Sequence, residues 1–85
     1  MTNEAMLERV RNVVAEVTEV ELERVNLQSS PANLEEWDSL AQVNIILSLE
    51  QECGVQFSVE EIEEMTDVDK ILQVLARKDL NRGAG

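Results

Sequence analysis

This 85-residue chain contains no histidine and no tyrosine, and it has one cysteine, one tryptophan, one phenylalanine and one proline. Without histidine, it lacks the side chain that most often acts as a general base or a metal ligand near neutral pH. The single cysteine, Cys53, excludes an internal disulfide. No apolar run approaches about 18 residues and no leader pattern is visible, so we expect a cytoplasmic protein that spans no membrane. These absences argue against an enzyme.

Positive charge is missing from the middle of the chain. The net charge is −11, and no lysine or arginine lies in residues 25–69, here called the acidic segment. The charges of the two flanks cancel, so this segment carries the whole net charge. Its field repels nucleic acid and anionic membranes and attracts basic protein surfaces, although a merely solubilising face is the alternative. Its eleven acidic residues are Glu35, Glu36, Asp38, Glu50, Glu52, Glu60, Glu61, Glu63, Glu64, Asp67 and Asp69.

The spacing of the apolar residues predicts helices. Valines recur at helical intervals over about residues 3–19, and a long loop follows to about residue 37, with a helical turn near residues 22–25. A second helix is predicted from Ser39 to about Cys53, with Gly54 as its stop. A short third helix begins at Ser58, with Glu61 placed for a capping box. A fourth helix spans about residues 68–78.

A chain of this length allows one domain with a modest core. The predicted fold is all-α, a small four-helix bundle of three long helices and one short one, with a long loop between the first two helices. We expect Thr66 to cap the last helix, with Asp69 completing its box. Residues 1–80 should form the domain, and residues 81–85 should be a disordered tail.

The predicted second helix is apolar on two faces. Ile45, Ile46, Leu49 and Cys53 fall on one side when residues are placed at about 100° each. A second stripe consists of Leu40, Val43 and Leu47, and a far side holds Ala41, Asn44, Ser48 and Gln51. The second stripe is either covered by the long loop or exposed for a partner.

Ser39 begins this helix. A serine at a helix N-terminus is usually a cap. The same position suits a phosphate, because free backbone N–H groups and the helix dipole stabilise negative charge. Spacing alone does not decide between these two interpretations.

Asp38-Ser39-Leu40 at the start of an apolar helix resembles the attachment motif of acyl and peptidyl carrier proteins. The resemblance extends to residues 34–40 (LEEWDSL), residues 49–55 (LEQECGV) and residues 65–68 (MTDV), and covers about residues 6–75. In that family the serine of the motif receives a 4′-phosphopantetheine arm from coenzyme A. The resemblance implies that Ser39 carries the arm, with Asp38 assisting recognition or metal placement by the transferase.

The chain departs from the family pattern at a few positions. Glu36 stands where a glycine is usual, the bulky Trp37 precedes the motif, and Cys53 replaces an aromatic residue. The early second helix has Gln42 and Asn44 where the family often has acids. These differences leave the attachment motif intact and favour a discrete carrier of a specialised, polyketide-type pathway over a housekeeping fatty-acid carrier.

The resemblance also implies partners. A phosphopantetheinyl transferase would load the arm, and acyl-loading, acyl-transferring or elongating enzymes would use the acyl or aminoacyl thioester that it holds. We expect a monomer whose contacts are transient and sensitive to salt, and no binding to nucleic acid or membranes. Leu40, Val43 and Leu47 would dock partners, and Ile62 and Met65 would line a nearby groove. The acids expected to orient partners are Glu35, Glu36, Glu50, Glu60, Glu61 and Glu64.

Other functions compete with this hypothesis. Cys53 as a nucleophile is disfavoured, since it lies on the core face without a basic neighbour. Asp67-Val68-Asp69 starts like a calcium loop, but the required glycine and closing glutamate are missing. An unmodified acidic adaptor that binds a basic partner is the main alternative, and no residue encodes the identity of the cargo.

Overall fold

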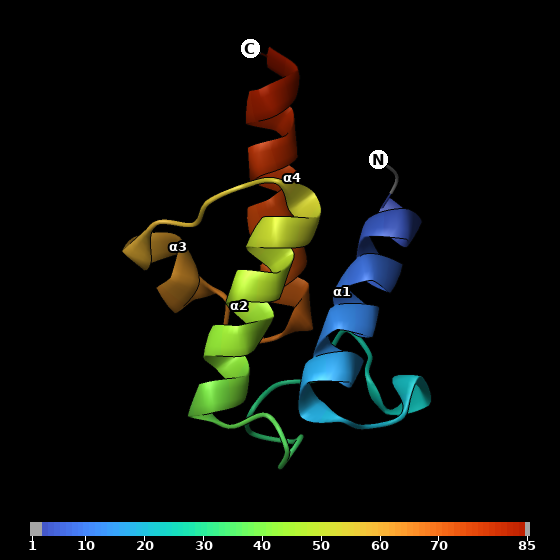
Figure 1. Ribbon diagram of the computed structural model, residues 1–85. Coiled ribbons are helices and arrows are strands. Elements are labelled where there is room, and N and C mark those ends of the chain that lie inside the picture. Colours follow the sequence, from blue (N-terminus) through green and yellow to red (C-terminus); the bar gives the residue numbers. More distant parts are fainter. Residues whose placement is uncertain (1–2, 85) are drawn as a thin grey trace.

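The computed structural model describes the backbone of residues 3–84 and the side chains of residues 4–78. The elements follow in the order α1 (Asn3–Thr18), η1 (Leu22–Arg24), α2 (Ser39–Cys53), α3 (Val59–Glu64) and α4 (Val68–Ala84). Within these residues there is no strand, and α1, α2 and α4 form the bundle while the short α3 lies at its side (Figure 1). The predicted all-α bundle of three long helices and one short one, with a long first loop, is confirmed.

Local signals set the ends of α2 and α3. Asp38 caps α2, because its Oδ1 accepts the backbone N–H of Ala41 at 2.8 Å. Gly54 ends α2 in the left-handed conformation, with a φ of 65° that favours glycine. Ser58 and Glu61 form the predicted capping box at the start of α3. These boundaries agree with the sequence predictions.

The predicted start of α4 at residue 68 is right, but its predicted cap and C-terminal end are wrong. Asp67 caps the helix in place of Thr66, since its Oδ1 accepts the backbone N–H of Lys70 at 2.7 Å. Asp69 does not complete a box, because its carboxylate accepts the side-chain amide of Gln73 at 3.1 Å. The helix continues to Ala84, so the backbone of residues 81–84 is helical where a disordered tail was predicted. Residues before Gly83 include no helix breaker that would end it sooner.

The core is formed by all three long helices and by the loop. Fully buried side chains include Val10 and Val14 of α1, Ile45 and Leu49 of α2, and Ile71 of α4. The loop contributes Val25, Leu34 and Trp37, while Leu27 of the same loop is 38% exposed. Burial of these side chains is the main stabilising term for so small a domain.

The long loop packs against α1 and the start of α4. The Arg11 guanidinium on α1 donates to the backbone carbonyls of Leu22 and Val25 at 2.9 and 2.7 Å. The backbone N–H of Val68 donates to the carbonyl of Ser29 at 3.0 Å, which ties the loop to the first turn of α4. The loop is thereby held away from the outer face of α2.

The short helix α3 buries none of its own residues fully. Polar contacts with its neighbours hold it in place. Glu50 on α2 accepts the backbone N–H of Phe57 at 2.9 Å, just before α3. On the other side, Lys78 of α4 pairs with Glu61 at 2.9 Å, and Arg77 pairs with Glu64. The position of α3 therefore depends on side-chain polar contacts more than on burial.

Candidate functional site

Ser39 is the first residue of α2 and is exposed. The capping role at this helix end belongs to Asp38, whose side chain holds the N–H of Ala41 and whose carbonyl accepts the N–H of Gln42 at 2.9 Å. The Ser39 hydroxyl is therefore not the cap that such a serine usually provides. An anion joined to this hydroxyl would lie at the positive end of the α2 dipole, where it is stabilised.

Trp37 and Gln42, two departures from the family pattern, have defined places beside Ser39. The Trp37 ring is 1% exposed, so the residue before Asp38 is an anchor for the loop. Its indole N–H donates to Oε1 of Gln42 at 2.6 Å, and Nε2 of Gln42 donates to the carbonyl of Met65 at 3.0 Å. The loop end, α2 and the end of α3 are thus joined next to the motif.

The second apolar stripe of α2 is exposed. Leu40, Val43 and Leu47 are 70%, 53% and 51% exposed, because the loop packs elsewhere. Val59 at the start of α3 is 73% exposed and was not among the predicted docking residues. Its place between Ser58 and Glu61, in the first turn of a short helix, was the available signal.

The predicted far side of α2 is partly wrong. Ala41 is 7% exposed and belongs to the core with Ile45 and Leu49, with which it forms a row at intervals of one turn. The same spacing of Ala41, Ile45 and Leu49 is visible in the sequence, but alanine is only weakly hydrophobic and so does not by itself indicate a buried position. Asn44 and Gln51 are exposed as predicted.

Met65 was predicted to line a groove for partners, and this prediction is wrong. Its side chain is 0% exposed and packs in the core, because the chain turns inward at the C-cap of α3. Ile62 is half-buried against the same core. Only the backbone carbonyl of Met65 takes part in the polar contacts near Ser39.

Four of the six predicted orienting acids are engaged within the chain. Glu36 forms a two-bond pair with Arg24, both at 3.2 Å, and these hydrogen bonds lower the pKa of the Glu36 carboxyl. The pKa of Glu61 is lowered by the backbone N–H of Ser58 and then by its hydrogen bond with Lys78. Glu50 holds the N–H of Phe57. Glu64 pairs with Arg77. The exposed members of the set are Glu35, Glu36, Glu60 and Glu64.

The residues of the alternative calcium-binding and nucleophile sites have structural roles. Asp67 and Asp69 serve the first turns of α4, and Cys53 is half-buried against the core. Among the residues described, no group of three or more potential ligands could hold a metal ion. None of the helices within that part of the chain is long and apolar enough to cross a bilayer.

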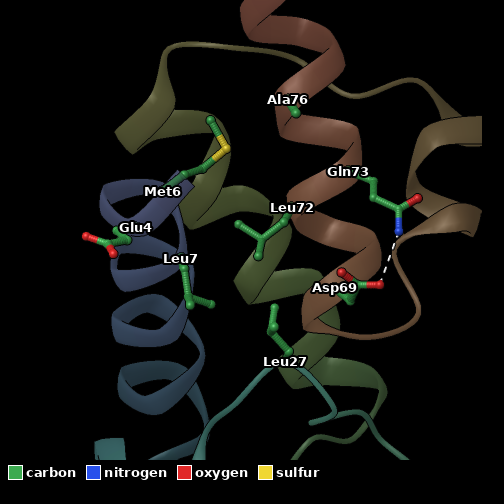
Figure 2. A pocket seen from close by; sticks show the side chains of 8 residues that line it. All are labelled: Glu4, Met6, Leu7, Leu27, Asp69, Leu72, Gln73 and Ala76. Carbon is green, nitrogen blue, oxygen red and sulfur yellow. Dashed lines mark hydrogen bonds between the residues drawn. The ribbon is translucent and has the colours of Figure 1, made fainter. Parts of the chain in front are cut away.

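A groove of about 390 Å³ opens between α1, α4 and the loop, on a different set of elements from Ser39. Figure 2 shows Met6 and Leu7 of α1 facing Leu72 of α4, with Leu27 at the lower end. Acidic and amide groups lie on the rim. The full lining is Glu4, Met6, Leu7, Leu27, Asp69, Leu72, Gln73 and Ala76.

Comparison with known proteins decides the family. Residues 8–75 match the family model described as a phosphopantetheine attachment site, and this range contains Asp38, Ser39 and Leu40. The chain belongs to the phosphopantetheine-binding carrier proteins. The predicted family and its 4′-phosphopantetheine group are thereby confirmed.

Relatives of this carrier protein share nearly its whole length. It is 35% identical to an acyl carrier protein of Thermosynechococcus vestitus over 78 residues, covering 92% of this chain and 96% of the relative. It is 28% identical to an acyl carrier protein of Coprothermobacter proteolyticus, covering 88% and 92% of the two chains. The solution structure of a holo acyl carrier protein from Nitrosomonas europaea superposes with a TM-score of 0.74 at 26% identity, covering 85% of this chain and 93% of that one.

Proposed function

We propose that this carrier protein holds acyl units as thioesters on a 4′-phosphopantetheine arm joined to Ser39. The observation that carries the proposal is an exposed serine at the first position of α2 whose capping role is taken by Asp38. Ser39 supplies the oxygen of the phosphodiester, and the N-terminus of α2 stabilises its negative charge. The group supplies a terminal thiol on which the acyl unit is held.

Asp38 caps α2 and is also exposed to a transferase. Its Oδ1 fixes the first turn of α2, which sets the direction of the Ser39 side chain. Because Asp38 is also exposed, a transferase can contact the same carboxylate during recognition or metal placement. Leu40, beside Ser39 and 70% exposed, gives the transferase an apolar contact.

The partner surface follows from exposure. Leu40, Val43 and Leu47 on α2 and Val59 on α3 are the large exposed apolar residues of these two helices, and we call them the docking patch. Exposed acids surround it and would orient basic enzymes, namely Glu35, Glu60, Glu63 and Glu64. A small apolar patch with charge steering gives fast, weak and salt-sensitive contacts, which suit a carrier that visits several enzymes in turn.

Catalysis in this scheme belongs to the partners. The chain has no histidine, and of its acids near Ser39, Asp38 is used as a cap and Glu36 pairs with Arg24. We infer that the protein acts as a monomer in the cytoplasm and that its enzymes include a phosphopantetheinyl transferase and acyl-handling enzymes. The relatives are named for the carried group and not for a pathway, so the specialised polyketide-type pathway stays a prediction.

The test is the mass of the intact protein after incubation with coenzyme A, Mg²⁺ and a phosphopantetheinyl transferase of broad specificity. We expect the wild type to gain the mass of one arm and Ser39→Ala to gain none. Ser48→Ala, which changes another serine of α2, is the matched control and should gain the arm as the wild type does. A wild type that gains no mass, or a Ser39→Ala variant that does, would contradict the proposal.

A further inference from the structure

A hydrogen-bonded bridge beside Ser39 has no part in the attachment chemistry. Trp37 Nε1 donates to Gln42 Oε1 at 2.6 Å, and Gln42 Nε2 donates to the Met65 carbonyl at 3.0 Å. An indole N–H only donates and a carbonyl only accepts, so one orientation of the Gln42 amide satisfies both neighbours. The bridge therefore requires, at position 42, a side chain as long as glutamine that carries both a hydrogen-bond donor and an acceptor.

The bridge lies directly next to the attachment residue. Gln42 follows Ser39 by one turn on the same side of α2, and Trp37 precedes it by two residues. Trp37 is 1% exposed, so the loop end of the bridge is fixed by the core. Gln42 thus connects this fixed group to the backbone at the end of α3.

This junction matters because, apart from the buried Met65 that ends it, α3 is held beside α2 mainly by polar contacts. None of its residues is fully buried. Glu50 holds the N–H of Phe57 at the start of the α3 segment, two turns further along α2, which is about 12 Å of helix rise. Gln42 holds the carbonyl of Met65 at the other end. The two side chains of α2 therefore bracket α3, and only Gln42 does so beside Ser39.

We propose that Gln42 is a positioning residue, which fixes the exposed face of α3 relative to Ser39 so that an attaching enzyme meets both as one surface. The inference rests on the proposed function of Ser39. Glutamate at this position would accept from Trp37 but, when ionised, could not donate to Met65, and asparagine would be too short to reach both. Glu63 and Glu64 are the exposed residues of α3 that directly precede the carbonyl held by the bridge.

Loss of the bridge has a defined kinetic signature. Without it, α3 occupies other positions for part of the time, and the apparent affinity of an enzyme falls with the fraction of correctly arranged carrier. The reacting hydroxyl is unchanged, so kcat stays the same while KM rises. From the usual strength of such hydrogen bonds, we expect KM for the carrier to rise about three- to tenfold.

The test compares variants in the transfer of the arm from coenzyme A, with KM and kcat measured at a temperature at which every variant is folded. Gln42→Met keeps the length of the side chain and removes both hydrogen bonds, and Trp37→Phe removes one of them. Asn44→Met places the same side chain at an exposed site of α2 and is the matched control. Amide hydrogen exchange of residues 59–66 is measured on the same unloaded proteins.

We expect Gln42→Met to raise KM, to leave kcat within about twofold and to speed exchange in residues 59–66, while Asn44→Met does neither. The double variant Trp37→Phe/Gln42→Met should be no worse than Gln42→Met, since both changes break one bridge. Faster exchange with an unchanged KM would show a merely structural residue and overturn the inference. Unchanged exchange in Gln42→Met would also overturn the inference, and this can be measured whether or not the wild type takes the arm. A wild type that takes no arm would instead contradict the proposed function of Ser39.

Discussion

Two leucines of α2 show how differently neighbouring residues of one helix are used. Leu49 is 0% exposed and lies in the core, whereas Leu40 is 70% exposed beside Ser39. The same side chain therefore stabilises the fold at one position and is presented to solvent at the other. A monomeric protein gains nothing from an exposed leucine for its own stability, which supports a role in docking.

This difference can be measured with one substitution at two positions. Leu49→Ala should lower the free energy of unfolding by about 2–5 kcal/mol, because it removes buried methyl groups and leaves a cavity. Leu40→Ala should change it by less than about 0.5 kcal/mol, since the side chain is already in water. Urea unfolding followed by circular dichroism gives both values. Equal losses for the two variants would contradict the burial described here.

Residues near Ser39 also mark how far sequence reasoning reaches. Asp38 as a cap and Gly54 as a stop were predictable because their effects act within four residues of the chain. Met65 was not, since its burial depends on how α3 packs against the rest of the molecule. The bridge from Trp37 through Gln42 ends on a backbone carbonyl, which has no signature in the sequence.

Among the elements, α3 stands apart because polar contacts hold it. Lys78 and Arg77 of α4 pair with Glu61 and Glu64, and Lys78 Nζ also lies 5.7 Å from the centre of the Phe57 ring. Ion pairs that are partly exposed are weak individually and are screened by salt. The attachment of α3 to α4 is therefore the part of the fold most sensitive to solution conditions.

The lowered pKa of Glu61 makes this sensitivity depend on pH. A carboxyl whose folded pKa is lowered stabilises the fold fully above its ordinary value of 4.5, and that stabilisation is lost as the pH falls through the folded value. We expect the urea midpoint to fall with acidification below 4.5, and to fall less in Glu61→Gln, which keeps the capping box but not the charge.

The neighbour Glu60 is exposed and provides the control for this experiment. Glu60→Gln should leave the acid dependence close to that of the wild type. The same steepness in wild type and Glu61→Gln would show that the pair with Lys78 does not contribute to stability in this range.

The helix boundaries illustrate what an element's own sequence can specify. The bounds of α2 follow from capping chemistry at both ends, and they agree with the predicted helix from Ser39 to about Cys53. The end of α4 was placed too early, because the basic residues Arg77 and Lys78 suggested a C-terminus while they in fact serve α3. Basic residues indicate a helix C-terminus through the helix dipole only when they form no tertiary ion pair.

At the scale of the whole molecule, charge is distributed by region. The acidic segment contains α2 and α3, and hence both Ser39 and the docking patch, while most basic residues lie on α1 and α4. A basic enzyme approaching in solution is therefore drawn to the side that carries the arm. Orientation before contact raises the rate of productive encounters.

This steering predicts a strong dependence on ionic strength. The kcat/KM for transfer of the arm by a basic transferase should fall about three- to tenfold when the salt concentration is raised from roughly 0.05 to 0.5 M. Glu60→Gln, which removes an exposed acid near the docking patch, should weaken that dependence. Glu16→Gln removes an exposed acid of α1 outside the acidic segment and should not. An equal effect of both substitutions would argue against directional steering.

Trp37 has a practical consequence because the chain contains no tyrosine and no second tryptophan. The ultraviolet emission of the protein comes from one indole, which is shielded from water and lies two residues from the serine. Its wavelength and lifetime report on the junction between the loop, α2 and α3. The protein thus contains its own optical probe beside the proposed attachment residue, so loading, unloading and enzyme contact at that site could be followed without an added dye.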